Sequence, residues 1–179
     1  EYKNRYLPEG MLLHTPENQA ATASITALMQ AQADGTLLEG RAVRCDVEHN
    51  LYVQLPCGEG IIPHIEGAAG IAEGVTKDIV LITRVNKAVS FVVTGFEQTE
   101  QGCRPILSRR IAQERCREEF IDRLQLGDVI PARITRLETF GAFCDIGCGL
   151  PALLPIVPVV PVELPMVPVE LPIGPVVPV

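Results

Sequence analysis

Aromatic residues and paired metal ligands are scarce in this chain. Of 179 residues, 4% are aromatic and none is Trp. The six cysteines are spread out without a Cys-x-x-Cys pair, and no histidine follows the nearest two, Cys144 and Cys148, at zinc-ligand spacing. We therefore expect no metal site, and free, mostly buried thiols in a reducing cytoplasm. No proline-free apolar run reaches 18 residues and no basic, then apolar start is present, so neither a membrane helix nor a secretion signal is expected.

The chain also lacks an excess of positive charge and the common catalytic motifs. Its formal net charge is −7, which argues against indiscriminate binding to polyanions or anionic membranes. The exception is local, because residues 103–136 hold eight arginines against five acids. No Gly-rich phosphate loop, His-Glu-x-x-His or Gly-x-Ser-x-Gly occurs, so we expect neither an enzyme nor a cofactor.

Proline is abundant only at the end of the chain. Nine of the 15 prolines lie in residues 151–179, between aliphatic residues. Proline disfavours helix and cannot donate a ladder hydrogen bond, so residues 157–179 are expected to be extended. Two hypotheses stay open for this tail: a semi-rigid arm that docks on a partner, or an unreliable stretch of sequence such as a frameshift.

The rest of the chain reads as helices around two β segments. A helix is expected from the Thr15 cap to Gly35, and another from Arg109 to about Gln125 after Ser108. Between them, short β-type runs separated by turn residues favour a five-stranded barrel. These runs are 42–45, 51–55, 60–63, 79–82, 89–93 and 105–107. A second β segment starts at Asp128, with Ile130, Ala132 and Ile134 on its buried face, and continues through 140–146.

The two β segments match one another. Residues 51–58 (Leu-Tyr-Val-Gln-Leu-Pro-Cys-Gly) align with 142–149 (Ala-Phe-Cys-Asp-Ile-Gly-Cys-Gly), and 60–63 (Gly-Ile-Ile-Pro) align with 152–155 (Ala-Leu-Leu-Pro). The offset is 91 positions in the first match and 92 in the second. A duplicated module is the economical explanation.

The second copy resembles the S1 RNA-binding domain. The likeness rests on Gly-Asp-Val at 127–129 and on Phe-Gly-Ala-Phe-Cys-Asp-Ile-Gly at 140–147. The resemblance implies a mainly β protein with a five-stranded OB-type barrel, and it covers roughly residues 37–156. The expected units are an N-terminal arm and helix (1–36), a divergent first barrel (37–108), a linker helix (109–126), the start of a second barrel (127–156) and the tail. The second copy stops matching after Ile156, and both copies carry proline where the family's third strand tends to carry a histidine.

Candidate binding residues follow from the alignment of the two copies. OB-type barrels stack bases on exposed aromatic rings while basic groups contact phosphates. In the second copy the candidates are Phe140, Phe143, Arg133 and Arg136. In the first copy, His49 and Tyr52 occupy the places of the two phenylalanines, Arg41 and Arg44 hold the equivalent strand, and His64 lies one position from the expected histidine. Each has a plainer alternative: a phenylalanine can be core, a turn histidine solvated, and an arginine paired with an acid.

The leading hypothesis is a non-enzymatic protein that binds single-stranded RNA, mRNA or rRNA, in translation or RNA metabolism. The resemblance alone implies tandem S1 repeats similar to those of bacterial ribosomal protein S1-like proteins, and a cytoplasmic setting. The alternative is a module that docks on the ribosome or another ribonucleoprotein, with little direct RNA readout.

Overall fold

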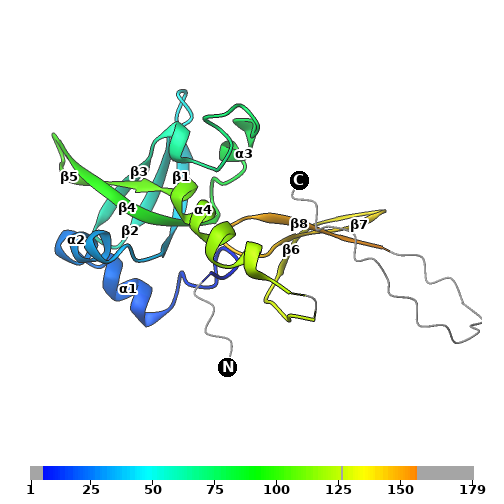
Figure 1. Ribbon diagram of the computed structural model, residues 1–179. Coiled ribbons are helices and arrows are strands. Elements are labelled where there is room, and N and C mark those ends of the chain that lie inside the picture. Colours follow the sequence, from blue (N-terminus) through cyan, green and yellow to red (C-terminus); the bar gives the residue numbers. More distant parts are fainter. Residues whose placement is uncertain (1–5, 126, 157–179) are drawn as a thin grey trace, which may run out of the picture.

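The computed structural model describes residues 6–125 and 127–156 of the chain (Figure 1). The expectations for residues 157–179 therefore lie outside the described residues. The described part is mainly β, as expected, with a five-stranded sheet, a separate three-stranded sheet, and helices at the N-terminus and between the sheets. In Figure 1 the three-stranded sheet projects away from the five-stranded one, and helix α4 lies between them.

Two short helices replace the single N-terminal helix that was expected. Helix α1 spans Pro16–Thr22 and α2 spans Ile25–Asp34. The helix is interrupted at Ser24, whose backbone is extended (φ −150°, ψ 161°). The Ser24 side chain accepts a hydrogen bond from Ala27 N and so caps the start of the second helix. The expected caps are confirmed: Thr15 accepts from Asn18 N, and Gly35 ends α2 in the left-handed conformation at φ 60°.

The first β segment closes into a five-stranded barrel in the order β1-β2-β3-β5-β4. Its strands are β1 (Leu38–Cys45), β2 (Leu51–Leu55), β3 (Gly58–Ile62), β4 (Ala88–Thr99) and β5 (Gly102–Ser108), with a short 3₁₀ helix, η1 (His64–Glu66), after β3. β3 and β5 pair in parallel at Ile61 and Ile106, and this pairing completes the ring. Alternate strand residues fill the interior, including Val53, Phe91 and Leu107.

The run Ile79–Ile82 is a helix, α3, and not the strand that was expected. Four consecutive aliphatic residues have no alternation that separates a strand from one helical turn. The barrel closes without this segment, so no strand edge remains for it to pair with. Only Leu81 is buried in the barrel core, while Ile79 and Ile82 are 57% and 46% exposed.

The linker helix α4 spans Arg109–Glu119 and ends earlier than expected. Phe120 leaves the helix at φ −127° and its ring packs in a second core with Cys116 and Cys144. A single 3₁₀ turn, η2 (Ile121–Arg123), follows. On α4, Arg110 pairs with Glu114 one turn later at 2.9 Å, and all six cysteines, which fall within the described residues, are free.

The second β segment forms a three-stranded sheet, β6-β7-β8. Its strands are β6 (Arg133–Glu138), β7 (Gly141–Asp145) and β8 (Pro151–Pro155). β6 begins after Pro131, later than expected. The expected alternation of buried and exposed residues fails, because all residues from Arg133 to Leu137 are exposed.

The register of the second sheet repeats that of the barrel pair by pair. Ala42 faces Val53 in the barrel, and Ile134 faces Cys144 in the sheet. Leu51 faces Ile62, and Ala142 faces Leu154. Each copy also has one irregularity on its first strand, between Ala42 and Arg44 and between Ile134 and Arg136, which are equivalent positions. The backbone therefore repeats as the sequence does.

The two copies differ in how far their inner faces are covered. Ala42 and Ile62 are completely buried in the barrel, whereas their equivalents Ile134 and Leu154 are 59% and 64% exposed. In the barrel, β4 and β5 close over this face. The part of the chain that the structure describes has no counterparts of β4 and β5 in the second copy, which explains why the predicted buried side of β6 is open.

Candidate functional site

Phe140 and Phe143 form an aromatic pair on the second sheet. Phe140 lies in the turn between β6 and β7, and Phe143 lies within β7. Their ring centroids are 6.2 Å apart with the planes at 87°, an edge-to-face contact. Phe140 is 54% exposed. Residues three apart on one strand would point to opposite faces of the sheet. Because Phe140 lies in the turn and not on the strand, its ring can contact that of Phe143 on one surface.

Arg136 lies beside this pair and is open to solvent. It faces Phe143 across the β6–β7 ladder, so the two side chains share one face of the sheet. The Arg136 side chain is 74% exposed and forms an ion pair with Glu138. An exposed ion pair of this kind is worth about 0–1 kcal/mol, so a competing anion can replace the carboxylate.

The equivalent surface of the barrel carries Tyr52 and His49. Tyr52 faces Arg44 across the β1–β2 ladder, as Phe143 faces Arg136. Here the guanidinium of Arg44 lies 3.2 Å from the centre of the Tyr52 ring, and it also holds Glu59 at 2.8 Å. One face of Tyr52 is therefore already occupied by a cation that is itself paired, so the first copy offers less free stacking surface than the second.

His49 and His64 come together at the same end of the barrel. His49 lies in the loop between β1 and β2, and His64 begins η1 directly after β3. Their ring centroids are 5.7 Å apart. Asp78, which precedes α3, contacts both: its carboxylate lies 2.7 Å from His64 Nε2 and 3.7 Å from His49 Nδ1. These hydrogen-bond and charge contacts hold the pKa of Asp78 below its usual value.

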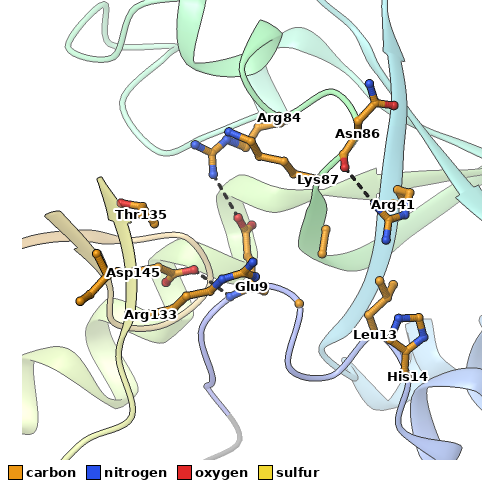
Figure 2. Close-up of a pocket in the computed structure, with 13 residues that line it drawn as sticks. Glu9, Leu13, His14, Arg41, Arg84, Asn86, Lys87, Arg133, Thr135 and Asp145 are labelled. Carbon is orange, nitrogen blue, oxygen red and sulfur yellow. Dashed lines mark hydrogen bonds and ion pairs between the residues drawn. The ribbon is translucent and has the colours of Figure 1, made fainter. Parts of the chain in front are cut away.

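Arg41 and Arg133, the equivalent residues of the two copies, line one cavity of about 410 Å³ between the barrel and the second sheet (Figure 2). Arg84 and Lys87 line it as well, so four cations stand against two carboxylates, Glu9 and Asp145. Arg41 donates to Asn86 O at 2.9 Å. The N-terminal segment with Leu13 and His14 forms a further wall.

Both carboxylates of this cavity are buried and already bonded. Glu9 accepts from Arg109 Nε at 2.7 Å, from Ser90 N at 3.0 Å and from Arg84 Nη1 at 3.4 Å. Asp145 accepts from the backbone N–H of Glu9 at 2.7 Å and of Gly147 at 2.9 Å. The acids of the cavity are therefore occupied by partners within the protein, whereas Arg41 and Lys87 are exposed.

Burial and charge act in opposite directions on these two acids. Desolvation raises the pKa of Glu9, but Arg109 and Arg84 outweigh it and leave the pKa below its usual value. Asp145 is buried beside the negative Glu9, and these effects raise its pKa despite its backbone hydrogen bonds. The net result is an ionised Glu9 held by two arginines.

The structure brings together some predicted residues and adds others. Arg41 and Arg133 share a cavity, Phe140, Phe143 and Arg136 share a surface, and His49 and His64 share a carboxylate. Sequence reasoning missed Asp78, which directly precedes the misassigned run 79–82, and also Arg84 and Lys87, which lie outside the arginine-rich stretch 103–136. Glu9 carried no signal at all, since its segment reads as irregular.

Comparison with known proteins adds no assignment. No protein-family model matches the chain, and no curated protein matches it significantly. Among the described residues, none of the helices has the length and apolar character needed to cross a membrane.

Proposed function

We propose that this protein binds single-stranded RNA, without catalysis, through S1-type OB barrels, of which the second copy supplies the principal contact surface. One observation carries the proposal: the exposed Phe140 and the half-buried Phe143 form an edge-to-face pair beside an exposed arginine. Aromatic rings at a protein surface stack with bases of any sequence, at about 1–3 kcal/mol per base.

The position of the pair within the fold supports the same function. OB-type barrels bind oligonucleotides on the face of strands 2 and 3 and at the loop between strands 1 and 2. Phe143 lies on the second strand of its copy, and Phe140 lies in the turn after the first. The closed strand order β1-β2-β3-β5-β4 of the first copy supports an OB-type barrel, and the matched register supports the same interpretation for the second copy.

The cavity cations give the phosphate backbone a second point of contact. Arg41 and Lys87 are exposed, and Arg133 reaches the cavity from β6. Because β6 carries both Arg136, beside the phenylalanine pair, and Arg133, in the cavity, a single β-strand links the aromatic rings to the cavity cations. The overall charge of −7 is compatible with this, since the positive charge is local.

The double variant Phe140→Ala/Phe143→Ala tests the proposal. A fluorescence-anisotropy titration of the full chain with a short, unstructured, labelled RNA measures the affinity at low and at physiological salt. We expect each lost ring to weaken binding by about 1–3 kcal/mol, with no change in the salt dependence, because stacking releases no counterions.

Leu137→Ala provides the matched control. Leu137 is 73% exposed on the same sheet but pairs with Ala142, so it lies on the face opposite Phe143. The control should bind RNA as the unchanged protein does. Equal RNA affinity of the folded double variant and the unchanged protein contradicts the stacking model.

A docking module is the second candidate, and the open inner face of the second sheet favours it. Ile134, Leu137 and Leu154 are each more than half exposed there. Exposed apolar residues that cluster in this way are typical of protein interaction sites. Under this reading RNA does not bind even at low salt, and Leu137→Ser/Leu154→Ser, rather than the phenylalanine variant, abolishes binding to purified ribosomes.

A further inference from the structure

Two histidines and one carboxylate from three separate segments meet at one end of the barrel. Their potential ligand atoms, on His49, His64 and Asp78, all lie within 4.8 Å of one another. Each side chain is only partly exposed, at 33%, 34% and 47%. Because imidazole nitrogen and carboxylate oxygen are the ligands that zinc and related divalent metals take, this set has the chemistry of a metal site.

The separations fit a tetrahedral ion. Zinc binds imidazole nitrogen at about 2.0–2.1 Å and carboxylate oxygen at about 2.0–2.2 Å, which places neighbouring tetrahedral ligands about 3.3 Å apart. The carboxylate of Asp78 lies 2.7 Å from His64 Nε2 and 3.7 Å from His49 Nδ1. These two separations differ from the tetrahedral value by about 0.4–0.6 Å, and because all the ligand atoms lie within 4.8 Å of one another, side-chain shifts of at most about 1.5 Å place one ion between them.

The backbone around these ligands is held in place before any ion arrives. Asp46 accepts from the backbone N–H of Glu48 at 3.0 Å and of Asn50 at 2.8 Å, and its carbonyl accepts from His49 N at 3.1 Å. The side chain of Asn50 in turn accepts from His64 N at 2.9 Å. Asn50 thus connects the segments that carry the two histidines.

His49 itself adopts an unusual conformation. Its φ is 63°, in the left-handed region, which is uncommon outside glycine, although asparagine, aspartate and histidine enter it more often than other residues. A histidine here costs conformational energy that a glycine would avoid. Such a residue in a hydrogen-bonded loop, with its ring near a second histidine, points to a function for its side chain.

We propose that His49, His64 and Asp78 bind one divalent transition-metal ion of the zinc class, with a fourth position open to solvent. The expectation of no metal site rested on the cysteines, and this site uses none of them. The proposed metal site goes beyond RNA binding and does not depend on that proposal, because metal binding is measured directly.

Isothermal titration of the full-length protein with Zn²⁺, under reducing conditions, tests the site. We expect one ion per chain, and at least tenfold weaker binding in His49→Asn and in His64→Gln, since even groups that only orient metal ligands are worth about 10- to 100-fold. Asparagine is chosen at position 49 because it tolerates the left-handed backbone, so the variant keeps the loop conformation.

His14→Gln is the matched control, because it removes the third histidine, which lines the cavity between the barrel and the second sheet. It should bind Zn²⁺ unchanged. Absorption of the Co²⁺-substituted protein separates the ligand types, since thiolate ligands add a charge-transfer band and His/Asp ligands do not. Any one of three results overturns the proposal: no Zn²⁺ binding, binding by His49→Asn and His64→Gln that is as tight as that of the unchanged protein, or a Co²⁺ spectrum of thiolate type.

Discussion

At the scale of single residues, Glu9 makes hydrogen bonds to several separate elements of the fold. Its carboxylate joins β4 through Ser90 and α4 through Arg109, while its backbone N–H and carbonyl bond Asp145 and Arg133 of the second sheet. One residue from an irregular segment thus ties the barrel, the linker helix and the second sheet together. Its side chain is 5% exposed and that of Arg109 is 1% exposed.

Glu9→Gln should therefore destabilise the protein strongly. Removing one partner from a buried ion pair leaves the other charge uncompensated, at a cost of about 3–5 kcal/mol. Urea unfolding followed by circular dichroism measures the change. Glu17→Gln, on the exposed first turn of α1, is the control and should change stability by less than about 0.5 kcal/mol. Equal stability of the two variants would contradict the role given to Glu9.

Glu39 makes stability depend on pH. Burial raises its pKa from 4.5 to about 7, although the backbone N–H groups of Gly10 and Leu12 donate to it at 3.0 Å. A pKa raised in the folded state stabilises the fold fully below about pH 4.5, and this contribution is lost as the pH rises through 7. The loss amounts to at most about 3 kcal/mol.

Glu39→Gln removes that titration while keeping an oxygen that accepts hydrogen bonds. As the pH rises from 5 to 8, the free energy of unfolding of the variant should increase by about 1–3 kcal/mol relative to that of the unchanged protein. Urea unfolding at both pH values measures the difference. Parallel pH dependence in the two proteins would show that Glu39 does not ionise in this range.

At the scale of elements, the glycine of the Phe-Gly-Ala-Phe motif has a packing reason. A Cβ at Gly141 would lie 2.5 Å from the carbonyl oxygen of Leu154 and 3.0 Å from the Cα of Pro155, both backbone atoms of β8. Backbone cannot move aside as a side chain can. The close approach of β7 and β8 thus requires glycine at this position, next to the residue that starts the aromatic pair.

Gly141→Ala should accordingly cost about 1–3 kcal/mol through overpacking and should loosen β8. Gly95→Ala, in β4, is the matched control, since its Cβ would meet only the end of the Ile106 side chain, at 4.0 Å. Amide hydrogen exchange of residues 151–155 reports the local effect and thermal unfolding the global one. Unchanged exchange in the Gly141 variant would mean that the strands separate to accept the methyl group.

Most of the helices and strands, but only part of the candidate site, could be predicted from the sequence. Caps at Thr15, Ser108 and Gly35 mark helix ends by local chemistry, and the repeat predicts which strands pair. Local signals cannot show how distant segments meet. The contact of Asp78 with two histidines, and of Glu9 with Arg109, joins residues 14 to 100 positions apart. Ile79–Ile82 was misread because its partner is the core and not a strand.

At the scale of the whole molecule, the cavity between the barrel and the second sheet is lined by residues of both copies. Arg41 and Arg133 hold equivalent places in the repeat and yet face the same space (Figure 2). A ligand in this space contacts both copies at once. The arrangement depends on the N-terminal segment, since Arg133 donates to the carbonyl of Glu9 at 2.9 Å.

Lys87→Gln tests whether RNA phosphates enter this cavity. Lys87 is exposed at its edge, so its loss should leave the fold intact. We expect the slope of log affinity against log salt to fall by about 0.7, the value for one phosphate contact with a single strand. Anisotropy titrations at several salt concentrations measure the slope. Lys77 is an exposed lysine outside the cavity, so the slope of Lys77→Gln should equal that of the unchanged protein. An unchanged slope for Lys87→Gln would show that RNA phosphates do not contact Lys87 in the cavity.

The matched register of the two copies makes their first loops exchangeable. Residues 46–50 lie between the paired residues Cys45 and Leu51, and residues 138–141 lie between the equivalent pair Leu137 and Ala142. Each stretch therefore starts and ends at the same positions of the same ladder, although one is a residue longer. We expect the loops to be exchangeable as cassettes without turning any strand residue to the opposite face, so that His49 and Phe140 change places while their partners His64, Asp78 and Phe143 stay on the scaffold.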